Sequence, residues 1–242
     1  MNLVIDIGNT RVKAALFKEN ELFQLKLYHS VSELLSDLPF IKQANHAIIG
    51  SVVEDLELFY AALQSILPTL IFTHQTNIPL KNQYQTTATL GSDRIAASVG
   101  AYTLYPQAEV LVIDAGTCIK YNFTNQHNEY LGGAISPGIQ MRYKALHEFT
   151  SKLPLVEFDR DFTELIGNNT QNSISSGVLN GSIVEIDGII NNYKLQFPNI
   201  ICVLTGGDSE FLAKRLKNSI FTHQNLVLKG LNDILNYNLE KK

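Results

Sequence analysis

The stretch that decides the fold is LVIDIGNTRVKAAL, residues Leu3–Leu16, because it recurs as LVIDAGTCIKYNF, residues Leu111–Phe123. With Asn9 skipped, seven of the thirteen aligned positions are identical. Each copy predicts a buried apolar strand, a tight turn built on Gly and Thr, and a second strand. The copies begin 108 residues apart, a spacing that indicates two similar halves and not a solenoid.

Strands followed by helices in both halves predict an α/β architecture with mixed sheets flanked by helices. We expect an N-terminal half at residues 1–90 and a C-terminal half at 91–242, with a connecting helix at 91–106. The two halves would face each other across a cleft between their Asp-x-Gly turns. Apolar spacing and stop signals predict further helices near 31–38, 54–66, 170–196, 209–217 and 229–239, and a polar loop over 74–90.

Composition excludes several classes of function. The 242 residues carry 19 Lys+Arg and 23 Asp+Glu, a net charge of −4 without a basic block, so we expect no nucleic-acid partner. No apolar stretch approaches the ~20 residues that span a bilayer, and the first residues show no secretory signal. We therefore expect a cytoplasmic protein with no membrane partner.

The two repeated turns carry chemistry suited to a polyphosphate. A carboxylate such as Asp6 at the end of a strand can hold a metal ion or its water shell. Gly8 allows close approach of the backbone, and turn N–H groups and hydroxyls can donate to phosphate oxygens. Lys13 could place a point charge near a transferring phosphoryl group. The alternative is that both turns are ordinary hairpins, since Asp, Asn and Gly are common turn formers.

The segment Gly91-Ser92-Asp93-Arg94 is the candidate for catalysis. A carboxylate in the first turn of a helix is favoured in its ionised form by the helix dipole, which suits a base that accepts a proton from an alcohol. Arg94 can bind a substrate anion with two hydrogen bonds. The alternative is a capping Ser with an Asp that pairs with the dipole. Two further glycine-rich segments, GGAISPG at 132–138 and TGGD at 205–208, end strands and could lie against a nucleotide.

Together these motifs resemble the type III pantothenate kinase family, part of the acetate kinase, sugar kinase, heat-shock chaperone and actin superfamily. DIGNT with Lys13 is similar to the first phosphate motif, DAGT at 114–117 to the second, and GSDR to the substrate motif Gly-x-Asp-Arg. The resemblance implies two ribonuclease H-like (actin-like ATPase) halves. It implies ATP-dependent phosphorylation of pantothenate to 4′-phosphopantothenate, the first step of coenzyme A biosynthesis.

The resemblance also assigns roles by position. Asp93 would be the base for the pantothenate hydroxyl, and Asp6 would organise Mg²⁺, directly or through water. Asp114 would hold a monovalent cation, K⁺ or NH₄⁺. The residues implied for ATP and its phosphates are Asp6, Ile7, Gly8, Asn9, Thr10, Arg11, Val12, Lys13, Gly116, Thr117, Gly206 and Gly207. Those implied for pantothenate are Tyr84, Gly91, Ser92, Asp93, Arg94 and Thr170.

Thr170 matches a threonine that reaches the pantothenate of a partner subunit, so the resemblance implies a homodimer, with the helix at 170–196 as the candidate interface. The chain departs from the family pattern at three places. Thr87 replaces a usual proline, and Asn122 replaces a frequent acidic residue, with the unusual Lys120 beside it. The third is the loop at 151–169, which is short and lacks a clear motif.

Two alternatives to a pantothenate kinase stay open. One is another small-molecule kinase of the same superfamily, because phosphate motifs do not choose between acceptor alcohols. The other is a nucleotide-binding regulator without kinase activity, since members of the family have been described as accessory factors for transcription.

Overall fold

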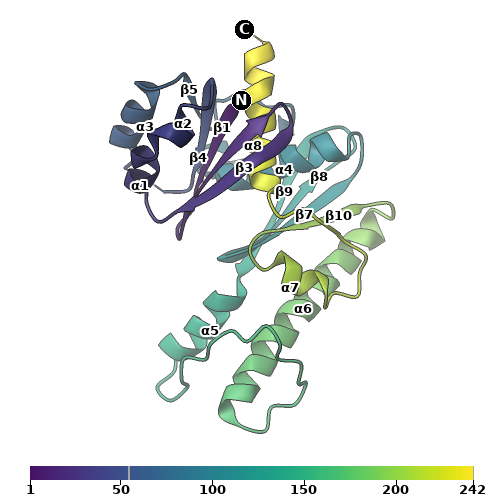
Figure 1. The fold of residues 1–242 in the computed structure, drawn as a ribbon. Helices are drawn as coiled ribbons and strands as arrows, with labels where there is room; N and C mark the ends of the chain where they lie inside the picture. The colour runs from purple at the N-terminus through teal and green to yellow at the C-terminus, as the bar shows by residue number, and fades with distance from the viewer. Residues whose placement is uncertain (54, 242) are drawn as a thin grey trace. The chain divides into compact units, whose positions relative to one another are not determined.

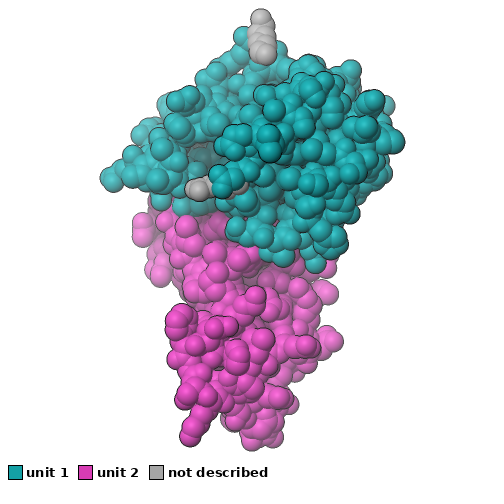
Figure 2. Space-filling view, turned by 90° about the vertical axis from the view of Figure 1, so that its left-hand side faces the viewer, with its two compact units in different colours: residues 1–107, 124–131, 225–242 teal, residues 108–123, 132–224 magenta. Residues whose placement is uncertain are grey.

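The computed structural model describes residues 1–53 and 55–241, which form two compact units. Unit 1 comprises residues 1–107, 124–131 and 225–242, and unit 2 comprises 108–123 and 132–224 (Figure 2). The boundary between halves at residue 90 stays a prediction. The elements are β1 Asn2–Ile7, β2 Val12–Lys18, β3 Glu21–Tyr28, α1 Val31–Ser36, α2 Leu38–Ile41, β4 His46–Ser51, α3 Glu57–Gln64, β5 Thr69–Ile71, β6 Lys81–Asn82, η1 Thr87–Thr89, α4 Ser92–Leu104, β7 Val110–Ala115, β8 Cys118–Thr124, β9 Glu129–Pro137, α5 Ile139–Glu148, α6 Thr170–Gln196, β10 Ile201–Thr205, α7 Ser209–Ala213, β11 Phe221–Thr222 and α8 Leu226–Glu240.

The first sheet has the strand order β3-β2-β1-β4-β5. β1 pairs with β2 antiparallel and with β4 parallel, and β4 pairs with β5 parallel. Successive side chains of a strand point to opposite faces, so β1 supplies two cores. Leu3 and Ile5 pack into one core with residues of α1, α2 and α3, whereas Val4 packs on the opposite face against residues of α4 and α8. Figure 1 shows these two groups of helices on opposite faces of the first sheet.

The close crossing of α4 and α8 depends on glycine. A Cβ built on Gly230 would lie 1.7 Å from the carbonyl oxygen of Ala96, and one on Gly100 would lie 2.6 Å from that of Leu226. Only the absence of a side chain lets the two backbones approach so closely. The C-terminal helix therefore fixes α4 on the first sheet, although more than 120 residues separate the two helices in sequence.

The second sheet repeats the order of the first. Its order is β11-β10-β7-β8-β9-β6, so β9-β8-β7-β10-β11 corresponds strand by strand to β3-β2-β1-β4-β5. β7 and β10 pair in parallel, as β1 and β4 do. The predicted α/β class with mixed sheets flanked by helices is confirmed. In unit 2, α5, α6 and α7 pack on one core that includes Leu111, Ile113 and Ile186.

The predicted elements agree with the structure except at a few points. The helix expected at 54–66 is α3, Glu57–Gln64, and residue 54 lies outside the described residues. The helix expected at 31–38 is divided into α1 and α2 because Asp37 caps the second helix and Pro39 lies in its first turn. The loop over 74–90 contains the short strand β6 and the 3₁₀ turn η1. The helix expected at 209–217 ends at Ala213. Among the described residues, no helix is both long and apolar enough to cross a membrane.

Gly230→Ala tests the crossing of α4 and α8. The added methyl must displace the backbone of α4, so we expect destabilisation on the order of 3 kcal/mol and a fall in Tm of roughly 5–10 °C. Glu240→Ala removes an exposed side chain from the same helix and should leave Tm within about a degree. Thermal unfolding followed by circular dichroism measures both, and an unchanged Tm for Gly230→Ala would contradict this packing.

Candidate active site

The first repeated turn joins β1 to β2 in unit 1. The N–H of Gly8 donates to the carbonyl oxygen of Arg11 at 3.1 Å, which closes the turn around the exposed Asn9 and Thr10. The register of β1 and β2 sets Asp6 opposite Lys13, so their side chains share one face of the sheet. It is the face of Val4, on which α4 packs. The carboxylate and the ammonium therefore face the helix that carries the substrate motif.

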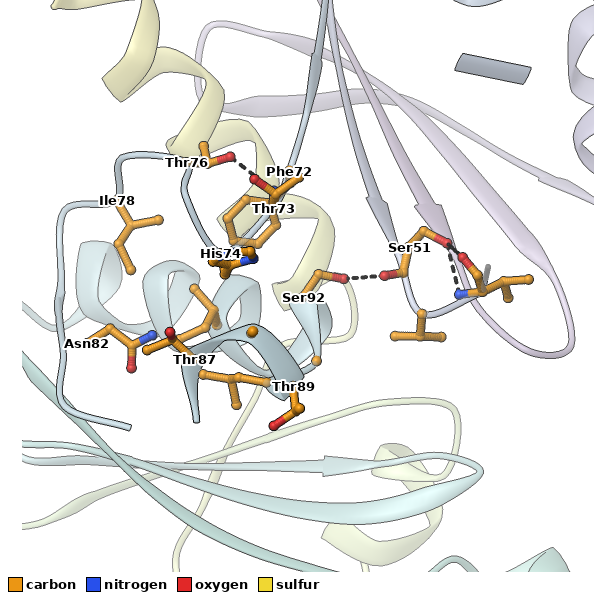
Figure 3. A pocket seen from close by; sticks show the side chains of 16 residues that line it. Ser51, Phe72, Thr73, His74, Thr76, Ile78, Asn82, Thr87, Thr89 and Ser92 are labelled. Carbon is orange, nitrogen blue, oxygen red and sulfur yellow. Dashed lines mark hydrogen bonds between the residues drawn. The ribbon is translucent and has the colours of Figure 1, made fainter. Parts of the chain in front are cut away.

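Strand β4 connects this turn to the substrate motif within the same unit. The N–H of Val52 donates to the carbonyl oxygen of Ile7 at 3.1 Å, at the end of β1. The hydroxyl of Ser92, the first residue of α4, donates to the carbonyl oxygen of Ser51 at 2.8 Å (Figure 3). The two motifs are 80 residues apart in sequence, and β4 brings both of them to the same edge of the first sheet.

Asp93 lies in the first turn of α4, half-buried, as the sequence predicts. Its Oδ1 accepts a hydrogen bond from the backbone N–H of Arg94 at 2.8 Å. A Cβ on Gly91 would lie 2.7 Å from the same oxygen. A side chain at position 91 would therefore displace the Asp93 carboxylate from this position.

Arg94 and Tyr84 form a second part of the same site. Arg94 is only 5% exposed, and its guanidinium carbon lies 5.5 Å from the centre of the Tyr84 ring. Tyr84 packs in turn against the buried Tyr130, with 6.2 Å between ring centres. A buried charge held against an aromatic face is well placed to bind an anionic group of a small molecule.

A pocket of about 540 Å³ opens beside the substrate motif in unit 1, within the size range of small-molecule sites. Gly91 and Ser92 line it, and Ser51 joins them from β4. Figure 3 shows Ser51 and Ser92 in this lining. The other polar lining comes from the loop between β5 and α4, which sequence reasoning described only as polar. The lining residues of that loop that it did not single out are Thr73, His74, Thr76, Asn82 and Thr89.

The second repeated turn lies in unit 2, where two glycine segments close on it. The N–H of Gly138 donates to the carbonyl oxygen of Thr117 at 3.1 Å, and a Cβ on Gly138 would lie 2.2 Å from that of Gly116. A Cβ on Gly206, whose φ is +95°, would lie 2.3 Å from the carbonyl oxygen of Ala115. The motifs DAGT, GGAISPG and TGGD thus meet in a glycine-lined cradle, on which Thr117 and Gly207 are exposed. That this cradle holds a nucleotide stays a prediction.

Two carboxylates near this turn are each paired with a cation of the chain. Lys120 places its ammonium 2.8 Å from Oδ2 of Asp114, and Arg160 lies 2.8 Å from Oδ1 of Asp208. Burial raises the pKa of Asp208, an effect that Arg160 partly offsets. The residues 1–53 and 55–241 contain no cluster of three or more His, Cys, Asp or Glu that could hold a metal ion.

A half-buried polar network holds the start of α5 at this cradle. Arg142 donates to the carbonyl oxygen of Pro137 and to Ser136, both at 2.9 Å, and it also pairs with Glu185 of α6. Burial alone would raise the pKa of Glu185, but hydrogen bonds from Arg142 and Ser136 outweigh it and hold that pKa below its ordinary value. The sequence does not indicate this network, because Glu185 lies 43 residues from Arg142 and on another helix.

Thr170 is exposed at the start of α6 in unit 2, where the side chain of Asn169 accepts from the N–H of Asn172. Thr170 lines a shallow depression of about 640 Å³ together with Leu146, Leu153 and Gly177. Tyr84 and the residues 91–94 belong to unit 1. The predicted pantothenate residues are therefore divided between the two units.

The two sheets of matching strand order define the fold class of the actin-like ATPases, with two ribonuclease H-like halves. A ROK hexokinase from Thermus thermophilus shares the fold, with a TM-score of 0.55 at 12% identity over 99% of both chains. So does a protein from Campylobacter jejuni assigned to the Baf family of transcriptional activators, with a TM-score of 0.69 at 22% identity over 98% of this chain and 99% of that one.

Sequence comparison gives the particular family. The family described as type III pantothenate kinase matches residues 2–192. A type III pantothenate kinase from Flavobacterium johnsoniae is 40% identical over 99% of both chains. The chain belongs to the type III pantothenate kinase family.

Glu185→Gln tests the polar network behind the cradle. The ionised carboxylate stabilises the fold because its pKa is lowered on folding, so we expect the variant to lose about 1–2 kcal/mol of unfolding free energy at pH 7. That contribution is present above the ordinary pKa of Glu and disappears as the pH falls through the lower folded-state pKa. The difference between the two proteins should therefore shrink between about pH 5 and pH 3.

Urea unfolding at pH 7, 5 and 3 measures the effect, with Glu148→Gln as the control at an exposed position of α5. A difference that stays constant with pH would show that the charge of Glu185 does not stabilise the network.

Proposed function

We propose that this chain transfers the γ-phosphoryl group of ATP to the primary hydroxyl of pantothenate, giving 4′-phosphopantothenate in the first step of coenzyme A biosynthesis. The observation that carries the proposal is that Gly91–Arg94 and the turn of DIGNT share one sheet edge through β4. Membership of the type III pantothenate kinase family supports the same reaction. The substrates are ATP and pantothenate, and we expect the enzyme to act in the cytoplasm.

In this proposal each residue of unit 1 has a role that follows from its position. Asp93 accepts the proton of the attacking hydroxyl, and the N–H of Arg94 keeps its carboxylate in place. The guanidinium of Arg94, stacked on Tyr84, binds the pantothenate carboxylate. Lys13 offsets negative charge on the phosphates. The pocket beside Gly91 receives the remainder of the substrate.

The proposal includes Mg²⁺, for which the Asp6 carboxylate is suited. A hard oxygen donor at the end of β1, beside a turn open to phosphate, is the kind of ligand that Mg²⁺ takes in kinases, usually with several waters. When bound, the ion supplies positive charge that offsets charge on the phosphates. In unit 2, Gly116, Thr117, Gly206 and Gly207 would contact ATP.

A monovalent cation at Asp114 is the remaining cofactor that the resemblance implies. Asp114 already holds the ammonium of Lys120 at 2.8 Å. Because one positive charge is in place on this carboxylate, the residues present do not fit an added K⁺ or NH₄⁺, and no part of the proposed reaction is assigned to one.

Asp93→Asn tests the base. The amide keeps the acceptor for the N–H of Arg94 but takes up no proton, so we expect kcat to fall about 10²–10⁴-fold with the fold intact. A coupled assay of ADP release with pantothenate measures it, and Asp161→Asn, at an exposed position, is the control. Near-normal turnover in Asp93→Asn would remove this residue from the role of base.

The same assay separates the alternatives. ADP release with an N-acetyl sugar or acetate, and none with pantothenate, would indicate another kinase of the superfamily. ATP binding without ADP release on any acceptor would indicate a nucleotide-binding regulator.

We also propose a homodimer formed through α6, so that Thr170 contacts the pantothenate of the partner subunit. Gly177, Gly181 and Val184 follow Thr170 at spacings of seven, four and three residues, which place all four on one face of the helix. Nothing lies within 4 Å of a Cβ on either glycine, and Val184 is 69% exposed. An open, small-residue face of this kind is suited to close packing against a second copy.

Val184→Asp tests this interface. A charge at the centre of the face should convert the dimer to a monomer and lower turnover at least about tenfold, because Thr170 would no longer reach a partner. Light scattering after size exclusion measures the mass. Gln196→Asp, which adds the same charge at an exposed position outside that face, should stay dimeric and active. A wild-type monomer, or a Val184→Asp dimer, would contradict the proposal.

A further inference from the structure

Lys120 is a charged residue of unit 2 to which the proposed reaction assigns no role. It follows the second repeated turn on β8, and its ammonium contacts the Asp114 carboxylate that ends β7. The alignment of the two repeats pairs Lys120 with Lys13 and Asp114 with Asp6. Since the register of β1 and β2 sets Asp6 opposite Lys13, both units place a lysine across from the aspartate of the phosphate turn.

We propose that Lys120 is a built-in cation that takes the place of a free monovalent ion at Asp114, so that phosphoryl transfer by this chain does not require K⁺ or NH₄⁺. This inference rests on the proposed function for its kinetic consequences. Its consequence for ATP binding, that ATP affinity does not depend on K⁺ or NH₄⁺, holds whichever acceptor is phosphorylated.

The chemistry of the two cations supports the replacement. NH₄⁺ and a lysine side chain both present N–H donors and one positive charge, so the ammonium of Lys120 is a tethered alkyl derivative of one of the expected ions. A tethered group needs no binding from solution, because its effective concentration at the site is fixed by the chain. The lysine can therefore hold its place at any concentration of K⁺.

The surroundings of Asp114 leave the carboxylate mostly out of water. Asp114 is 9% exposed, and the lysine and aspartate side chains retain 18% and 12% of their accessible surface. Oδ2 faces Lys120, whereas Oδ1 lies against Gly206, at which a Cβ would be only 2.7 Å away. One oxygen is thus bound by the ammonium of Lys120, and the other lies close to the backbone of the TGGD segment.

The neighbouring charges point to the same conclusion. Asp208, whose N–H donates to the carbonyl oxygen of Ala115, is paired with Arg160 at 2.8 Å. Both carboxylates at this turn are therefore compensated by side chains of the chain itself. A polyphosphate approaching the turn would meet a neutralised carboxylate without any ion from solution.

The experiment compares the wild-type chain with Lys120→Met, which has a side chain of similar length without charge, and with Lys144→Met as an exposed control on α5. ADP release with pantothenate and Mg²⁺ is measured in choline, Na⁺, K⁺ and NH₄⁺ chlorides at one ionic strength. ATP affinity by calorimetry and Tm are measured in the same four salts.

We expect the wild type and Lys144→Met to vary less than about twofold in turnover and in ATP affinity among the four salts. In choline, Lys120→Met should have turnover and ATP affinity at least about tenfold below those of the wild type. Most of this loss should be regained in K⁺ or NH₄⁺, because either ion can enter beside Asp114. Its Tm should rise in K⁺ relative to choline, whereas the wild-type Tm should not.

The inference is overturned if wild-type turnover or ATP affinity rises tenfold or more on replacing choline with K⁺, or if Lys120→Met binds ATP as the wild type does in choline. If Lys120→Met does not fold, Lys120→Gln takes its place in the same measurements. The comparison of the wild type among the four salts then still tests whether Lys120 replaces the ion. Absence of pantothenate-dependent ADP release in every salt would count against the proposed function, and ATP affinity would then decide the role of Lys120 separately.

Discussion

The candidate site of unit 1 depends on the contact between the backbones of α4 and α8. Gly230 and Gly100 let the backbone of each helix lie directly against backbone carbonyl groups of the other. This crossing holds α4 on the face of the sheet to which Asp6 and Lys13 point. α4 carries both Asp93 and Arg94, so the position of the base and of the anion-binding group is set by packing at the far side of the helix. A buried face can fix such positions more tightly than the exposed turns can, because side chains in a packed interior have few alternative arrangements.

Close backbone contacts at glycines also occur in unit 2, where they shape the second repeated turn. There the glycines 138 and 206 let two turns lie directly against the backbone of residues 115–117, because no side chain stands between them. Backbone groups have no rotamers to lose on binding, which suits a cradle for phosphates. The network of Arg142, Ser136 and Glu185 stands behind it and fixes the direction in which β9 enters α5.

Much of this arrangement could be predicted from the sequence because its signals are local. The repeated run of apolar residues, Asp and Gly predicts β1 and β7 with their turns. The apolar spacing over 170–196 predicts a helix with the same first and last residues as α6. What the sequence does not contain is the pairing of distant groups. The crossing at Gly230, the contact of Ser92 with Ser51 and the lining of the pocket by residues 73–89 all depend on tertiary packing. The division of α1 from α2 was missed for another reason: Asp37 and Pro39 are a local start signal inside an apolar run.

The pair formed by Asp114 and Lys120 shows why a motif alone does not define a cofactor. DAGT at 114–117 is the same tetrapeptide whether its carboxylate holds an ion from solution or a side chain, and the difference lies six residues further along the chain. A chain with a net charge of −4 has no basic surface to concentrate a polyphosphate, so each negative group at its site has to be compensated locally. Lys120 and Arg160 compensate the two carboxylates of the second turn, and Lys13 stands across from that of the first. The charges that matter for ATP are therefore placed one by one on neighbouring strands and loops. At such a site, a single substitution to lysine can replace an ion that would otherwise have to bind from solution.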